Sequence, residues 1–271
     1  MSLSRGFGMK KVVIILVGIL VLTGAFLGLR TIPVVRQGLD NYAINTMTDC
    51  YGKTNLKPEY EATILAIAHE MGISEPIVIR KMSSIALQKF GYYNAFVAFA
   101  LLFDVIPYSN QPFMFVSEGF FEDLSPEEQR FLIGHELIHI RERHTMFVNL
   151  VKVLFTIILL LPWYCAVLYF RRRFAERTIL MVICVYLLLC VVLVIPKLAT
   201  FNYLRYMEKI ADCESLKLLN THEGCLKLLK RWETDFKMAH HHDYYGILAD
   251  HPSNYERKCY CLELQKESKK N

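Results

Sequence analysis

The sequence predicts a mainly α-helical protein with a small β-sheet and three transmembrane helices. The first observation behind this prediction is compositional: 54% of the 271 residues are hydrophobic, while 21% are charged. The second is that the charges are unevenly spread, which leaves segments 12–29, 153–170 and 178–195 without any. Since a helix needs about 20 apolar residues to cross the hydrocarbon layer, each segment is close to the length of a span.

Two of these assignments have alternatives. Positive residues precede segment 12–29, as they do in a signal peptide. Its apolar run is longer than a usual signal core, which favours an uncleaved anchor. Segments 153–170 and 178–195 could instead form a buried helical hairpin in the core of the protein.

Positive charge predicts the orientation in the membrane. The loop between the second and third segments contains four arginines, Arg171, Arg172, Arg173 and Arg177. Cytoplasmic loops carry an excess of lysine and arginine, so the net charge of +5 indicates topology and not nucleic-acid binding. Residues 30–146 and 199–271 would then share the exocytoplasmic side of a plasma or inner membrane. A site facing the cytosol is the alternative.

The segments between the predicted spans indicate a small α+β domain. We expect a connecting stretch at 31–57 and a helix at 58–71, which Gly72 would end. Residues rich in β-formers predict strands at 76–80, 95–103 and 113–117, with a turn at 107–112.

A further helix is predicted by the signals at its start. Ser125 and Glu128 have the spacing of a capping box, and Pro126 stands at the first helical position. The helix is expected to continue through His135 and His139.

His135, Glu136 and His139 form an HExxH motif on that helix. Two histidines one turn apart project from the same face and can bind one metal ion. Glu136 is then placed to take a proton from the attacking water as general base. The plain alternative is a pair of structural histidines that match the motif by chance.

The third ligand is predicted to come from a later helix. Glu142 and Thr145 occupy the positions where a metzincin has glycine and histidine, which excludes that class. Glu208 lies between Arg205 and Asp212 along one helical face. We expect Glu208 to bind the metal, Asp212 to accept the second ring N–H of a zinc histidine, and Arg205 to hold Asp212. A solvated face with an ion pair is the alternative.

The chain resembles the HtpX and CAAX-prenyl-protease type of membrane zinc metallopeptidase, the gluzincins. The resemblance rests on four motifs in the family's order: Asn94-Ala95-Phe96, His135-Glu136-x-x-His139 with His144 beyond, Arg205-x-x-Glu208-x-x-Ala211-Asp212, and Asp250-His251-Pro252-x-x-x-x-Arg257. It implies a zincin-like α+β catalytic domain.

The resemblance also implies roles for further residues. A substrate peptide would pair in extended form with the edge at Asn94, Ala95 and Phe96, and His251 or Arg257 would stabilise the oxyanion. The chain departs from the pattern, because such proteins usually have two spans before the catalytic domain and this sequence has one.

These observations predict four segments: an anchor at 1–30, the first part of a peptidase domain at 31–147, a transmembrane hairpin at 148–199 and the second part of the domain at 200–271. By analogy with quality-control members of the family, we expect an endopeptidase with one zinc ion that cleaves unfolded or membrane-associated proteins. Its partners would be protein or peptide substrates and the bilayer, without nucleic acid, and the oligomeric state is not predicted. The alternative is a catalytically silent membrane scaffold or partner-binding pseudo-protease with a structural zinc site.

Overall fold

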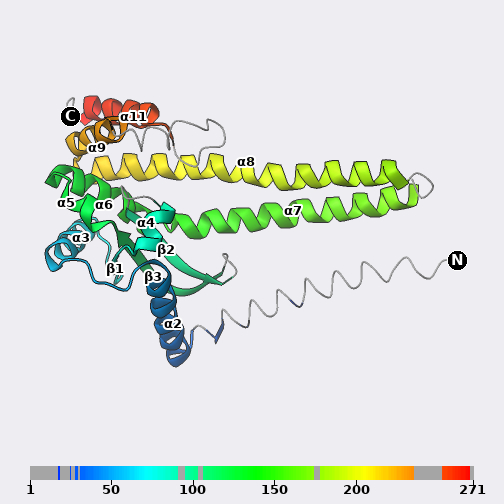
Figure 1. Cartoon of the computed structure of the whole chain (residues 1–271), viewed down its shortest axis with the longest axis horizontal. Coiled ribbons are helices and arrows are strands. Elements are labelled where there is room, and N and C mark those ends of the chain that lie inside the picture. The colour runs from blue at the N-terminus through cyan, green and yellow to red at the C-terminus, as the bar shows by residue number, and fades with distance from the viewer. Residues whose placement is uncertain are drawn as a thin grey trace.

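Figure 1 shows a body of helices and a small sheet, from which two long helices project side by side. The computed structural model describes residues 31–90, 95–102, 106–173, 178–234 and 252–268, together with positions 18, 25, 28 and 29. Within these ranges the chain is mostly helical, with one three-stranded sheet. The predicted class, mainly α with a small sheet, is therefore confirmed.

The sheet has the strand order β1-β3-β2. Strand β1 (Val78–Lys81) runs parallel to β3 (Ile106–Val116), and β2 (Ala95–Leu102) runs antiparallel to it. The predicted strands near 76–80 and 95–103 are confirmed within a few residues.

The turn predicted at 107–112 is wrong, because β3 runs through these residues. Strand β1 pairs only with residues 113–116 of β3. Strand β2 pairs with residues 106–107 and 112–116, with a register shift between the two parts. Pro107 and Pro112 thus lie where β3 has a partner strand on one side only. A proline, which has no N–H, is tolerated at such a position.

Alternating side chains of β3 pack against helices on the two opposite faces of the sheet. Phe113 and Phe115 pack in one buried cluster with Ala43 and Ala86. These two alanines belong to α2 (Pro33–Tyr51) and α4 (Ser84–Phe90). Met114 and Val116 face the opposite cluster, which contains the buried residues of α6 (Pro126–Arg141). Helix α6 therefore packs on the face of the sheet opposite to α2 and α4.

Helix α2 replaces the connecting stretch expected at 31–57, so that prediction is wrong. The helix has 19 residues and packs against β3. Of the signals that mark a helix start in sequence, it has a proline at the first position, Pro33, but no others. Ile32 at the N-cap makes no side-chain capping hydrogen bond, and the first turn has no acidic residue. Packing against the sheet therefore stabilises a helix that the sequence pattern alone does not predict.

Two shorter helices complete this half of the body. Helix α3 (Pro58–Glu70) confirms the helix predicted at 58–71, with Ile64 and Ile67 buried. Gly72 follows with φ +73°, a conformation that L-residues other than glycine rarely adopt. Helix α5 (Glu118–Glu122) directly follows β3.

The start of α6 has the predicted capping box. The Ser125 backbone N–H donates to Glu128 Oε2 at 2.8 Å, and the Glu128 N–H donates to Ser125 Oγ at 3.4 Å. Arg231 of α9 (His222–Thr234) also donates to Glu128, at 3.0 Å. The first turn of α6 is thus anchored to the second half of the chain.

The two long helices are α7 (His144–Arg173) and α8 (Thr178–Leu219). They contain the segments 153–170 and 178–195, whereas segment 12–29 lies mostly outside the described residues. Within the part of the chain that the structure describes, no helix reaches the length and hydropathy that a membrane crossing requires.

Helix α8 has 42 residues and continues from the hairpin into the body. There it packs against α6 and against α11 (Asn254–Ser268), which also contacts α9. A second capping box begins α11: the Ser253 N–H donates to Glu256 Oε2 at 2.9 Å, and the Glu256 N–H donates to Ser253 Oγ at 3.2 Å. Helices α6, α8 and α11 are the elements that form the site described next.

Candidate metal centre

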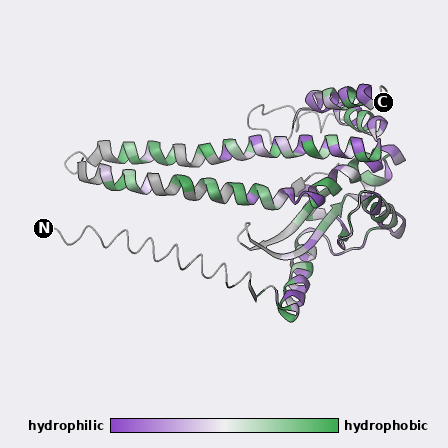
Figure 2. Cartoon of the chain, turned by 180° about the vertical axis from the view of Figure 1, so that it is seen from behind, coloured by the Kyte–Doolittle hydropathy of each residue, from purple (hydrophilic) through white to green (hydrophobic). Residues whose placement is uncertain are grey.

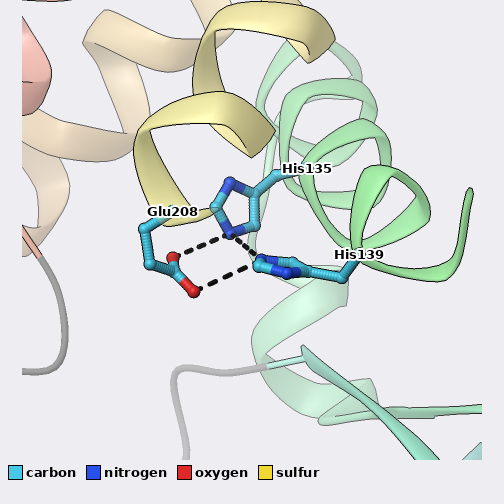
Figure 3. Close-up of side chains that lie close together, drawn as sticks. All are labelled: His135, His139 and Glu208. Atoms are coloured by element: carbon cyan, nitrogen blue, oxygen red, sulfur yellow. Dashed lines mark hydrogen bonds and ion pairs between the residues drawn. The ribbon is translucent and has the colours of Figure 1, made fainter. Parts of the chain in front are cut away.

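Helix α6 brings His135 and His139 together, as their spacing of four residues predicts. Their Nε2 atoms lie 3.1 Å apart (Figure 3). His135 is buried and His139 is half-buried. The helix faces both the sheet and α8, so these side chains lie at the junction of the two halves of the body.

Glu208 reaches the same point from α8. Its Oε2 lies 3.2 Å from His135 Nε2, and its Oε1 lies 3.3 Å from His139 Nε2. Figure 3 shows the carboxylate facing both rings. The two histidines and the glutamate that the sequence singled out therefore converge in the fold.

The distances between these atoms suit one tetrahedral metal ion. Ligand atoms about 2.0–2.1 Å from such an ion lie about 3.3 Å from one another. The two Nε2 atoms are 3.1 Å apart, and each lies 3.2 or 3.3 Å from one of the two Glu208 oxygens, close to that edge length. One atom from each residue lies within 4.8 Å of the others. Three protein ligands leave the fourth position of a tetrahedron to water or substrate, as in catalytic sites and unlike closed structural ones.

Asp212 holds the first histidine from one turn further along α8. Its Oδ1 lies 2.8 Å from His135 Nδ1, the ring nitrogen on the side away from Glu208. Burial on its own would lower the pKa of the His135 imidazole, but hydrogen bonds to Asp212 and Glu208 raise it to about 10. The carboxylates thus make His135 a strong base, as suits a metal ligand. The expected contact between Asp212 and a histidine of the motif is present.

Arg257 of α11 binds the Asp212 carboxylate with two hydrogen bonds. Its Nε donates to Oδ2 at 2.8 Å and its Nη2 donates to Oδ1 at 2.7 Å, while its guanidinium lies over the Trp232 ring. Burial opposes ionisation of Asp212, yet the charge of Arg257 and the bond to His135 lower the pKa of that carboxyl. Asp212 is therefore held as an anion.

The sequence assigned this partnership to Arg205, and here the structure corrects it. Arg205 Nη2 donates to both oxygens of Glu256, at 3.0 and 3.2 Å. Arg205 and Asp212 lie on the same helix, but α11 brings Arg257 to the carboxylate. A pattern along one helix cannot reveal a partner contributed by a distant one.

His144 contacts the second histidine of the motif. Its Nδ1 lies 2.8 Å from His139 Nδ1 at the first residue of α7. Burial and the neighbouring His139 lower the pKa of His144 to about 4, so its imidazole is neutral. The sequence pattern included His144 in a motif without giving it a role. The signal that could have pointed to His144 is its position at the break between α6 and α7, one helix after the motif.

Gly134 allows α6 and α8 to approach closely. A Cβ at this position would lie 2.5 Å from Ser215 Oγ and 2.4 Å from Leu219 Cδ1, distances shorter than any normal contact. Since Gly134 precedes His135 and Ser215 follows Asp212 by less than one turn, the close approach occurs beside the ligands.

The remaining predicted residues lie around the ligands or outside the described ranges. Glu136 is buried on α6, next to His135. Strand β2 contains Ala95 and Phe96 and lies against α6. Asn94 and His251 are outside the residues that the structure describes.

Comparison with known proteins agrees with this site. The family model for peptidase family M48 matches residues 55–259, which is more than half of the chain and includes His135, His139 and Glu208. Neither the curated proteins nor the solved structures contain a significant match to this chain.

Proposed function

The chain belongs to peptidase family M48, and on that premise we propose that it is a membrane-bound zinc endopeptidase that hydrolyses peptide bonds of unfolded or membrane-associated proteins. The observation that carries this proposal is the convergence of His135, His139 and Glu208: the two Nε2 atoms lie 3.1 Å apart, and each faces one oxygen of the carboxylate, at 3.2 and 3.3 Å. These residues would hold one zinc ion.

Zinc would supply Lewis acidity and lower the pKa of a water molecule in its fourth position to about 7. The chain itself supplies the general base. Glu136 follows a ligand on α6 and would take the proton of the attacking water, then pass it to the leaving amine. Asp212 and Arg257 keep His135 in one orientation throughout.

The oxyanion role suggested for Arg257 has less support than a positioning role. Its Nε and Nη2 both donate to Asp212, and the side chain is buried. We therefore propose that Arg257 acts through Asp212, and that His251 is the residue to test for contact with the oxyanion.

Strand β2 is the proposed docking edge for substrate. It pairs with β3 on one side, and its Ala95 end belongs to the cluster that contains the buried residues of α6. An extended peptide added to the other side of β2 would gain main-chain hydrogen bonds and lie along the helix that carries the ligands.

From the sequence, we propose that the uncharged segments 153–170 and 178–195 cross the membrane, together with segment 12–29. Sequence supports this, since 153–170 and 178–195 contain no charge. Figure 2 shows hydrophobic residues along the outer part of the hairpin and hydrophilic ones near the body. Several of the large apolar side chains there are exposed: Leu154, Ile158, Val182, Ile183, Leu187 and Val194.

This proposal places the catalytic centre close to the bilayer. Helix α8 continues without interruption from Ile195, the end of the proposed span, to Glu208. At about 1.5 Å per residue, the two lie about 20 Å apart along the axis. An extended chain covers about 3.3 Å per residue, so a membrane-anchored substrate would be cut no closer than about six residues from the bilayer surface.

Substitution of the general base tests the proposed activity. Glu136→Gln should retain zinc and lose cleavage of casein, because the amide cannot accept the proton of water. Glu142→Gln, at the exposed end of the same helix, is the matched control and should remain active. The alternative, a silent scaffold with a structural metal, requires wild type and both variants to be equally inactive while binding zinc. Cleavage by Glu136→Gln at the wild-type rate would remove the proposed mechanism.

The side of the membrane is tested with a native cysteine. Cys50 is exposed on α2, within the proposed catalytic part. The arginine-rich loop supports an exocytoplasmic site in a plasma or inner membrane. In that case a membrane-impermeant maleimide should label the wild type more than Cys50→Ser in intact cells. A difference that arises only after permeabilisation supports the cytosolic alternative instead.

A further inference from the structure

We infer that His144 is a positioning residue that fixes the tautomer and orientation of the metal ligand His139. The inference rests on the metal site of the proposed function and adds a residue to it. The observation that carries it is the 2.8 Å contact between His144 Nδ1 and His139 Nδ1.

The direction of this hydrogen bond follows from the ligand geometry. His139 turns its Nε2 toward His135 and Glu208, so a metal there would take the lone pair of Nε2. A neutral imidazole then has its proton on Nδ1 and donates it. His144 Nδ1 must be the acceptor, which leaves the proton of His144 on Nε2.

The backbone is shaped to make this contact. In a continuous helix, His144 would lie about 140° around the axis from His139 and could not reach it. Instead α6 ends at Arg141, and Arg143 adopts φ +51°, in the left-handed region that non-glycine residues rarely occupy. Helix α7 begins at the next residue, which returns the His144 ring to His139.

The two zinc histidines are therefore held in different ways. His135 meets a carboxylate whose charge Arg257 balances, whereas His139 meets an imidazole. His144 is 3% exposed, so water does not replace it as acceptor in this fold. Loss of the acceptor should leave the His139 N–H buried and unpaired and weaken metal binding.

Two substitutions separate positioning from packing. His144→Phe keeps an aromatic ring and removes the acceptor. His144→Asn loses the ring, but its Oδ1 is bonded to Cγ as Nδ1 is in histidine and can accept the same hydrogen bond. If His144 only fills space, phenylalanine should be the better replacement. If it positions His139, asparagine should be.

The measurement is zinc affinity of the full-length protein by competition with a chromophoric chelator. We expect affinity to fall about 10–100-fold in His144→Phe and to stay within about threefold of wild type in His144→Asn. His69→Phe, at an exposed position of α3, is the control and should bind zinc as the wild type does. Equal affinity of His144→Phe and wild type overturns the inference, as does weaker binding by asparagine than by phenylalanine.

A measurement on the wild type covers the case in which a variant does not fold. Imidazole ¹⁵N shifts of the zinc-loaded protein should give His139 as protonated at Nδ1 and His144 as protonated at Nε2. A metal bond at His139 Nδ1, or a proton at His144 Nδ1, overturns the inference and leaves the proposed function intact. Wild-type protein that binds no zinc overturns both.

Discussion

Asp212→Asn is the substitution whose consequences the structure defines most fully. The Asp212 carboxylate is 1% exposed and accepts two hydrogen bonds from Arg257 and one from His135. An asparagine has the same shape, but its amide nitrogen is a donor and would face a donor of the arginine. The change therefore removes one charge and one acceptor without altering volume.

Two magnitudes follow. The Arg257 guanidinium is 5% exposed, and removing one partner of a buried ion pair costs about 3–5 kcal/mol because the remaining charge is uncompensated. His135 loses the carboxylate that raises its basicity, and loss of such a partner weakens metal binding by about 10–100-fold. We expect both effects in Asp212→Asn.

The assay needs both readouts, since a destabilised protein also binds metal less well. Urea unfolding of the metal-free protein measures the first effect, and chelator competition under folded conditions measures the second. Glu256→Gln is the control, because it breaks the pair with Arg205, whose side chains are 27% and 41% exposed. It should lower stability by at most about 1 kcal/mol and leave zinc affinity unchanged.

A double substitution distinguishes the two effects. Arg257→Met in the Asp212→Asn background removes the unpaired charge, so part of the lost stability should return. Zinc affinity should remain low, since His135 still lacks its carboxylate. Wild-type affinity in Asp212→Asn would refute the reasoning that Asp212 supports the ligand.

Three further predictions concern the ligand set, the helix junction and pH. Glu208→Ala should lose zinc on dialysis. Glu214→Ala, at a half-buried position of α8 that pairs with Lys217, should keep it. Full zinc in Glu208→Ala would exclude Glu208 as a ligand. Gly224→Ala should lower the free energy of unfolding by about 1–3 kcal/mol, because its Cβ would lie 2.0 Å from the Glu127 carbonyl oxygen. Gly38→Ala, where a Cβ meets nothing within 4 Å, is the control and should leave the free energy of unfolding unchanged. Burial opposes ionisation of Glu128, but hydrogen bonds from Arg231 and Ser125 lower its pKa below 4.5. The stabilisation of the fold by the ionised Glu128 is therefore present above pH 4.5 and is lost as pH falls through that lowered pKa. The difference in melting temperature between wild type and Glu128→Gln should therefore shrink under acid, and a constant difference would contradict this.

Much of the site could be predicted because its signals are local. His135 and His139 share a helix whose start is marked by Ser125 and Glu128, and the capping box forms as expected. Glu208 and Asp212 lie one turn apart on α8, so a single helix presents ligand and support together. Helical periodicity alone places such pairs on one face.

The errors arise where stability comes from contacts between distant segments. Helix α2 has no side-chain N-cap and no acidic residue in its first turn, and it forms against β3. Strand β3 runs through Pro107 because its neighbour β1 pairs only with residues 113–116. Propensity read along the chain does not contain these contacts, since it takes no account of which strand lies beside another.

The sequence by itself identified the three residues that converge, the helix that carries two of them and the apolar segments that lie between them and Glu208. Only the tertiary structure decided that Arg257 holds Asp212, that Arg205 pairs with Glu256 and that His144 returns to His139. The reason is physical. A ligand spacing of one turn is a property of a single helix, whereas the partner of a buried ligand depends on which helices pack around it, and that packing is set by the whole chain.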